Sequence, residues 1–392
     1  MIYADHAATT KISETAKLAM LSAMEKDWYN PSSLYTPGQQ ASGTLMDARV
    51  RIAHCLGCLP KEIYFTSGGS EADNQAILSA AAIGKRQGKM HIISTAFEHH
   101  AVLHTLKKLE KEGFEITLLD VGEKGIVSPV QVEKAIRPDT ILVTVMYANN
   151  EIGTIQPIRE IGAICRKNGV LFHTDAVQAA GHLQINVEKD QIDMLSLSAH
   201  KFNGPKGIGV LYAKTGVFLT NLIEGGGQER GKRAGTENLP AIVGMVAALE
   251  EACSLQKERS IYVTKLRDQL IDGLKKIPGA LLNGDATNRL PGNVNFCFPD
   301  TEAEGLLLLL DNKGICASSG SACTSGFLDP SHVLLAIGLP HEIAHGSMRL
   351  SFSDDNTEED IDYILEIVPE IVSYLRSMSP LWEKIKKQEA QG

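Results

Sequence analysis

The 392-residue sequence predicts an α/β protein with a mostly parallel sheet and a second, smaller α/β domain. Through the first two thirds of the chain, short runs rich in β-branched residues alternate with stretches of helical length, which is the pattern of strands joined by crossover helices. Several of these runs are apolar without strict alternation, as is typical of strands covered on both faces. The length also exceeds what one simple core supports.

The large sheet is expected to contain seven strands, each a short apolar run followed by small or polar residues. These runs are residues 63–67, 91–95, 116–120, 141–147, 170–174, 194–198 and 208–213. Helices are expected between most of them, for example over residues 71–87, 99–112 and 157–168.

The pattern changes after about residue 255. A long charged helix over residues 240–277 leads into loops, a strand at 294–298, a helix at 302–312, a strand at 348–352 and a helix at 357–376. We therefore expect a large domain at residues 14–257, with residues 1–13 and 258–392 forming the small domain.

Composition narrows the possible partners. The net charge of −9 and the pI near 5.8 argue against nucleic acid or an anionic membrane. The N-terminal residues lack a basic segment followed by an apolar run, and no apolar run reaches the roughly 18–20 residues of a membrane helix. Seven cysteines in a long chain do not resemble a disulfide framework. We therefore expect a cytoplasmic protein without a nucleic-acid or membrane partner.

Three short motifs have ordinary explanations, and no metal site is predicted. Residues 341–345 match the zinc motif HExxH, but a strand-like run begins three residues later and leaves room only for a short helix. Residues 226–233 nearly match a phosphate-binding loop, yet arginine replaces the hydroxyl that binds magnesium. Cys55 and Cys58 form a CxxC without the second pair of a zinc site, and Gly57 favours a helix end.

Polar residues follow five of the predicted strands at the carboxyl ends, where ligands of parallel sheets bind. Gly69 and Ser70 open a helix and offer N–H groups and a hydroxyl to a phosphate. The other four strands are followed by His99, by Asn149 and Asn150, by Asp175 and Gln178, and by His200 and Lys201. Each has an ordinary alternative, such as a helix cap, a core histidine or a solvated lysine. Together they indicate one ligand.

Pyridoxal phosphate accounts for the set, because it needs a lysine for its aldehyde, a carboxylate that keeps the pyridine nitrogen protonated, a group that stacks on the ring, and a phosphate cup. The chain also resembles the cysteine desulfurases of the NifS/IscS type, which are fold-type I enzymes of the class V aminotransferase family. The resemblance runs nearly end to end. It rests on DHAATT at 5–10, NPSS at 30–33, FTSGGSEADN at 65–74, EHHAV at 98–102, ANNEIGTIQPI at 148–158, HTDAVQAAG at 173–181, SAHKFNGPKGIG at 198–209, RAGTEN at 233–238, SSGSACTSG at 318–326 and SMRLSFS at 347–353.

The resemblance implies a role for each matching residue. Lys201, rather than Lys206, would hold the cofactor, Asp175 would pair with its pyridine nitrogen, and His99 would stack on the ring and handle substrate protons. The remaining cofactor contacts would come from Asn150 and Gln178 at the ring oxygen, from Gly69, Ser70, Ser198 and His200 at the phosphate, and from Thr236 of a partner subunit. Arg349, assisted by Asn30, would bind the substrate carboxylate.

The implied function is cysteine desulfuration. The thiolate of Cys323, in a loop at about residues 316–330, would take sulfur from L-cysteine as a persulfide and leave L-alanine. The implied partners are a second copy of the chain, with shared active sites, and a sulfur-accepting iron–sulfur scaffold protein of the IscU/NifU type, which SPLW at 379–382 would help to dock. The alternatives are a selenocysteine lyase, an aminotransferase, or a non-catalytic scaffold that binds a sulfur carrier. Cys323 argues against the aminotransferase, and the intact Lys201, Asp175 and Arg349 argue against the scaffold.

Overall fold

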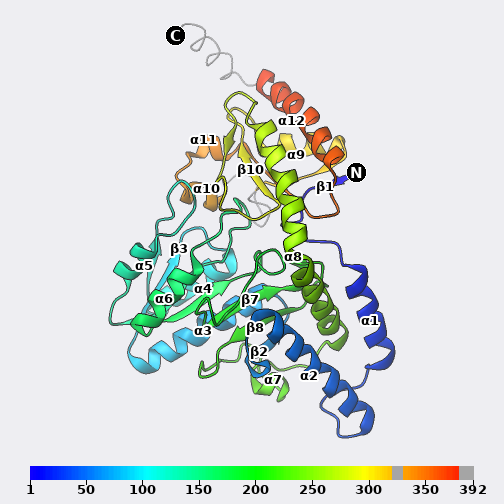
Figure 1. Ribbon diagram of the computed structural model, residues 1–392. Coiled ribbons are helices and arrows are strands. Elements are labelled where there is room, and N and C mark those ends of the chain that lie inside the picture. Colours follow the sequence, from blue (N-terminus) through cyan, green and yellow to red (C-terminus); the bar gives the residue numbers. More distant parts are fainter. Residues whose placement is uncertain (320–329, 379–392) are drawn as a thin grey trace.

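The computed structural model describes residues 1–319 and 330–378, and its lower part in Figure 1 is built on a seven-stranded sheet. The strand order is β2-β8-β7-β6-β5-β3-β4; β8 is antiparallel to both neighbours and the remaining pairs are parallel. The strands are β2 (Ile63–Thr66), β3 (His91–Thr95), β4 (Glu115–Leu119), β5 (Thr140–Thr144), β6 (Leu171–Asp175), β7 (Met194–Ser198) and β8 (Gly209–Ala213). The predicted fold class is confirmed.

Helices cover this sheet, and every residue of β3, β5, β7 and β8 is buried. This explains why the sequence shows apolar runs without alternation. The helices between the strands are α3 (Gly69–Gln87), α4 (His100–Lys111), α5 (Pro129–Ala135) and α6 (Ile158–Asn168). Short 3₁₀ turns, η1 (Pro60–Glu62) and η2 (Ala199–Lys201), lead into β2 and out of β7.

Helices α1 (Glu14–Lys26) and α2 (Thr36–Leu56) pack against the first half of α8 (Leu239–Leu274). The sequence pattern did not locate α1, and of α2 it located only the C-terminal end. A four-residue helix, α7 (Gln228–Gly231), precedes α8. Its Glu229 is buried and pairs with Arg49 of α2, so the segment that resembled a phosphate-binding loop has a packing role. The CxxC segment ends α2 as predicted, because Gly57 has a positive φ of 71°.

The upper part of Figure 1 contains the smaller sheets. Strands β9 (Leu281–Leu282), β10 (Asn293–Cys297) and β12 (Ser347–Ser351) form an antiparallel sheet, and β1 (Ile2–Tyr3) pairs in parallel with β11 (Ile315–Cys316). The helices here are α9 (Ala303–Asn312), α10 (His332–Ala336), α11 (His341–Ala344) and α12 (Glu358–Met378).

Helix α8 belongs to two hydrophobic cores. Its first half, through Ala252, packs into the core of the large sheet. Its second half, from Val263, packs into a core with Ala4, β10, β12 and α12. The predicted domain boundary at residue 257 lies within this helix, and the two-domain division remains a proposal. By length and composition α8 could cross a membrane, but 56% of its apolar window is buried inside the protein, as in the core helix of a soluble protein.

Candidate active site

A cavity of about 350 Å³ lies at the carboxyl ends of the strands of the large sheet, next to β12. Its lining brings together ten residues that the sequence predicted. They are Gly69, Ser70, His99, Asn150, Asp175, Gln178, Ser198, His200, Lys201 and Arg349. The cavity thus combines a cation, a buried acid, a histidine and a helix N-terminus, all held by regular structure.

The phosphate end of the cavity is the start of α3. Gly69 and Ser70 are the first two residues of this 19-residue helix, whose opening N–H groups and dipole favour an anion. A Cβ on Gly69 would lie 2.6 Å from Val177 Cγ2, so only glycine fits there. Ser198 and His200 complete this end. Burial and the neighbouring Lys201 lower the pKa of His200 to about 4, so its ring is neutral.

Lys201 projects into the cavity from the 3₁₀ turn after β7. Its Nζ donates to the backbone carbonyls of Ala7 at 2.6 Å and Ala8 at 2.7 Å. Lys206, the alternative in the same motif, is exposed and does not line the cavity. The geometry therefore favours Lys201 as the amine that a cofactor aldehyde would meet.

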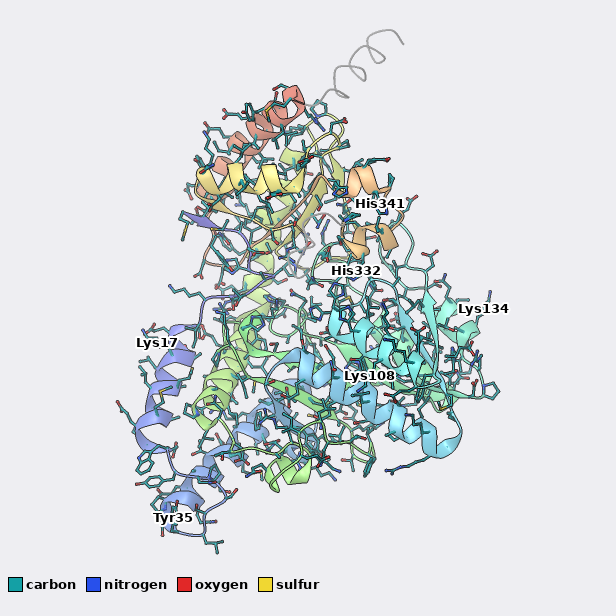
Figure 2. All side chains as sticks on the ribbon, turned by 180° about the vertical axis from the view of Figure 1, so that it is seen from behind. Lys17, Tyr35, Lys108, Lys134, His332 and His341 are labelled. Carbon is teal, nitrogen blue, oxygen red and sulfur yellow. The ribbon has the colours of Figure 1, made fainter. Side chains whose placement is uncertain are left out.

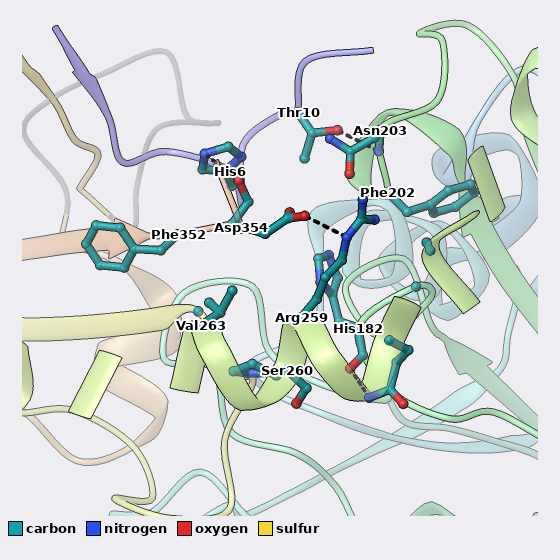
Figure 3. A pocket seen from close by; sticks show the side chains of 16 residues that line it. His6, Thr10, His182, Phe202, Asn203, Arg259, Ser260, Val263, Phe352 and Asp354 are labelled. Carbon is teal, nitrogen blue, oxygen red and sulfur yellow. Dashed lines mark hydrogen bonds and ion pairs between the residues drawn. The ribbon is translucent and has the colours of Figure 1, made fainter. Parts of the chain in front are cut away.

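A second, much smaller cavity of about 40 Å³ has in its lining Phe202 and Asn203, the two residues that follow Lys201 in the chain (Figure 3). His182 donates from Nε2 to the Lys201 carbonyl at 3.1 Å. Across the same cavity Arg259 of α8 points to Asp354, with 2.7 Å between Nε and Oδ2. Gln256 of α8 donates from Nε2 to the His182 carbonyl at 3.0 Å, so the backbone of Lys201 is linked through His182 to α8, and the ion pair links α8 to the loop after β12.

Two acidic residues, Asp175 and Asp73, line the active-site cavity. Asp175 ends β6, and its Oδ1 accepts from Val177 N at 2.9 Å. Burial raises the pKa of Asp175, while His99 and Lys201 oppose that rise. Asp73 of α3, which the sequence analysis missed, is also buried, and its Oδ1 has no hydrogen-bond partner. It lies one turn after Ser70 on the same helix face, and that spacing was the available signal.

His99 is the N-cap of α4, and its ring orientation is fixed. Nδ1 accepts from Ala101 N at 3.1 Å. A nitrogen that accepts a hydrogen bond carries no proton, so the proton of the neutral ring is on Nε2. The preceding residue, Glu98, is fully buried; burial raises its pKa to about 8 although Met146 N and Thr95 Oγ1 donate to it.

Arg349 of β12 reaches the cavity from the smaller sheet. Its Nη2 donates to Asp5 Oδ1 at 2.7 Å and its Nη1 to the Asn150 carbonyl at 3.1 Å. The guanidinium is therefore held from both sides while it lines the cavity. Gln178 donates from Nε2 to the Ala7 carbonyl at 2.9 Å, so its amide nitrogen already has a partner. Asp5 and Ala7 belong to the DHAATT motif, but the sequence analysis gave neither residue a role in the site.

Not every predicted residue reaches this cavity. Asn30, in the loop between α1 and α2, is exposed and accepts from Ser32 N, and within its own chain it does not line the site. Thr236, before α8, is likewise exposed and outside the lining. Cys323 and the SPLW segment fall outside the described residues. The HExxH motif forms only the four-residue α11, which ends before its second histidine.

The residues present fit pyridoxal phosphate. They supply an amine in Lys201, a buried acid in Asp175, a ring in His99 and an anion site at the start of α3. This donor set matches the aldehyde, the pyridine nitrogen, the ring face and the phosphate of that cofactor. Arg349 is left for a second anion, such as a substrate carboxylate.

Comparison with known proteins agrees with this geometry. The family model for aminotransferase class-V matches residues 2–364. Proteins named cysteine desulfurase IscS are 53% identical in Clostridium botulinum, over 100% of this chain and 99% of theirs, and 54% identical in Methanosarcina thermophila, over 98% and 95%. A solved NifS-like protein superimposes with a TM-score of 0.89 at 38% identity over 95% of this chain and 99% of its own. The chain therefore belongs to the class V aminotransferase family.

Proposed function

We propose that the chain is a pyridoxal phosphate-dependent cysteine desulfurase. The observation that carries the proposal is the convergence of Lys201, Asp175, His99 and Arg349 on one cavity, in a chain more than half identical to proteins of that name. A solved relative titled SspA in complex with cysteine, 37% identical with a TM-score of 0.79 over 90% of this chain and 99% of its own, supports the same substrate.

Substrate binding is assigned to Arg349. Its planar guanidinium can donate two parallel hydrogen bonds to the α-carboxylate of cysteine. Asp5 and the Asn150 carbonyl hold it in place, so little side-chain entropy is lost when the substrate binds. Lys201 lines the same cavity as Arg349, so a substrate bound there by its carboxylate would share the cavity with the Lys201 amine.

Proton transfer is assigned to Lys201 and His99. Pyridoxal phosphate, when bound, supplies an aldehyde that links to amines and a protonated ring that accepts electron density. Asp175 would keep a proton on the pyridine nitrogen. Lys201 would be the general base that removes the α-proton of the substrate. His99, with its proton on Nε2, is assigned the proton transfer at the substrate thiol.

Sulfur transfer is assigned to Cys323. Its thiolate attacks the substrate sulfur, the carbon–sulfur bond breaks, a persulfide forms on Cys323, and the remaining carbon skeleton is protonated and leaves as L-alanine. The described residues on either side of this segment support the assignment. Ser318 pairs with Arg349 through two backbone hydrogen bonds of 2.6 and 3.1 Å, and Ser331 donates to Glu151, the neighbour of Asn150.

Assembly and delivery complete the proposal. The exposed Thr236 would reach the phosphate site of a second copy, which makes the protein a homodimer with shared sites. Apolar side chains exposed on or beside α1 and α2 support such an interface; they include Leu18, Met24, Trp28, Leu34 and Tyr35. An iron–sulfur scaffold protein in the cytoplasm is the proposed sulfur acceptor.

The test is replacement of Cys323 by alanine. Cys323→Ala should keep its cofactor absorbance and should still change spectrum when L-cysteine is added, but it should release no sulfide above background. Cys316→Ala, seven residues earlier on β11, is the matched control and should keep its activity. If Cys323→Ala releases sulfide at the wild-type rate, or if Cys316→Ala abolishes release, the assignment of the nucleophile is wrong.

A further inference from the structure

Two cysteines far apart in sequence meet on the surface away from the active-site cavity. Cys55 lies in the last turn of α2, and Cys253 lies near the middle of α8. Both residues line the same surface cavity, and each thiol shifts the pKa of the other. Cys55 therefore has a thiol neighbour on another helix, in addition to Cys58 in its CxxC motif.

An ion pair holds the two helices in this register. Arg51, one turn before Cys55, donates from Nε to Oε1 of Glu250 at 2.9 Å. Glu250 in turn lies three residues before Cys253. Residues three or four apart share a helix face, so the ion pair and the thiol pair are successive contacts along one seam. The proximity of the thiols follows from this packing of α2 on α8.

The thiol pair is accessible. Both sulfur-bearing residues line a cavity of about 570 Å³, together with His54, Asn186 and Lys257. Cys253 is exposed and Cys55 is half-buried. Neither residue lines the cavity that contains Lys201. A small solute can therefore reach the thiols without entering the active site.

The pair is also chemically asymmetric. Interaction with Cys55 lowers the pKa of the Cys253 thiol, and interaction with Cys253, followed by burial, raises the pKa of the Cys55 thiol. A lowered pKa increases the thiolate fraction, which is the reactive form. Cys58 differs, because burial raises its pKa to about 12. Of the two thiols, the exposed Cys253 is therefore the more readily ionised.

We propose that Cys55 and Cys253 form a redox-active dithiol that hydroperoxides convert into a disulfide between α2 and α8. The Cys253 thiolate attacks the peroxide, the O–O bond breaks, and a sulfenic acid and hydroxide form. The Cys55 sulfur then attacks the sulfenic sulfur, the S–S bond forms, the S–O bond breaks, and the thiol proton leaves with that oxygen as water. The two thiols lose two electrons, and hydrogen peroxide is reduced to two molecules of water.

The experiment treats the holoenzyme with hydrogen peroxide, blocks free thiols with an alkylating reagent, and maps tryptic peptides by mass. Cys55 and Cys58 share the peptide 52–61, and Cys253 lies in the peptide 234–257. The wild type should give these two peptides joined and lighter by two hydrogens, and dithiothreitol should reverse the link. Cys58→Ser is the matched control and should still form it. Cys55→Ser and Cys253→Ser should not.

Each other outcome overturns the proposal. A mass loss confined to peptide 52–61 would mean that Cys55 pairs with Cys58. Oxidation of Cys253 to sulfinic acid without a joined peptide would mean that Cys55 does not act as the second thiol. A joined peptide that persists in Cys55→Ser but is lost in Cys58→Ser would mean that Cys58, and not Cys55, forms the disulfide with Cys253. If Cys55→Ser does not fold, Cys55→Ala supplies the same comparison.

Discussion

Two buried carboxyl groups, Asp73 and Asp175, line the active-site cavity; burial raises the pKa of both, and Asp175 raises that of Asp73 further. Asp175 also faces the positive side chains of the site, whereas the nearest basic group to Asp73 is His173, 3.6 Å away. Burial lowers the pKa of His173 to about 3, so that ring is neutral. The pKa of Asp73 thus lies well above its usual value, whereas His99 and Lys201 favour the carboxylate form of Asp175, so Asp175 is the better partner for a cationic ring nitrogen.

Replacement of Asp175 by asparagine should separate cofactor binding from catalysis. The amide keeps the shape of the side chain but cannot hold a proton on the pyridine nitrogen by charge. We expect the variant to retain cofactor and to lose about 100-fold or more in kcat for sulfide release. Cofactor content from absorbance and a sulfide assay measure the two effects. Wild-type turnover in a fully loaded variant would contradict the assignment of Asp175.

The residue types of the site could be predicted because strand ends of a parallel sheet converge. Asp73 and Asp5 were missed for a physical reason: their partners, His173 and Arg349, are distant in sequence, and only the folded chain brings them together. Asn30 and Thr236 were predicted as site residues but lie outside the cavity for a different reason. Their expected roles depend on groups outside the cavity of their own chain, which a single sequence does not place.

At the scale of elements, α10 is linked to the site by one buried contact. Ser331 caps α10 by accepting from the N–H groups of Val333 and Leu334, and it donates to the carboxylate of Glu151. Glu151 is fully buried, and burial raises its pKa to about 7 although Ser331 and Arg349 oppose the rise. A second link is His332, which contacts the Glu98 carbonyl at 2.9 Å; Figure 2 shows it between the two parts of the molecule.

Glu151 should make stability depend on pH. Its pKa rises from 4.5 in the unfolded chain to about 7 in the folded chain, so the folded state binds more protons between these values. The free energy of unfolding should therefore fall as pH rises through this window. Glu151→Gln removes that contribution, so its stability relative to wild type should improve by up to about 3 kcal/mol from about pH 5 to pH 8. Urea unfolding at several pH values measures the free energy of unfolding of both proteins. If the difference between variant and wild type does not change with pH, the raised pKa of Glu151 is contradicted.

Elements differ in how well the sequence locates them. Buried strands such as β3 and β7 match their predicted ranges, because a short apolar run suffices to identify them. Helix α1 was missed because Leu18, Leu21 and Met24 remain exposed, which removes the one-sided apolar pattern of a surface helix. The same exposure indicates that this face is covered by something else.

At the scale of the whole molecule, that cover is expected to be a second copy. Tyr35 lies at the outer tip of the α1 and α2 pair in Figure 2, and Trp28 and Leu34 in the connecting loop are 67% and 92% exposed. Burial of such side chains against a partner is worth about 1.5–3 kcal/mol each.

Trp28→Glu should therefore weaken the dimer. We expect wild type to sediment as a dimer and the variant to shift toward monomer, with weaker cofactor binding because Thr236 no longer reaches the other site. Tyr374→Glu, at an exposed position on α12, is the control and should stay dimeric. A wild-type monomer that binds cofactor tightly would refute the shared site.

The contacts of the N-terminal residues determine when the active site can form during translation. Asp5 and Ala7 bond to Arg349 and Ser351, and β1 pairs with β11, more than 300 residues later. During translation these first residues leave the ribosome long before their partners exist. Because the Ala7 and Ala8 carbonyls also hold Lys201, the active site acquires its final shape only when the chain is almost complete. A nascent chain stalled before residue 349 should therefore bind cofactor poorly, even with every strand of the large sheet already made.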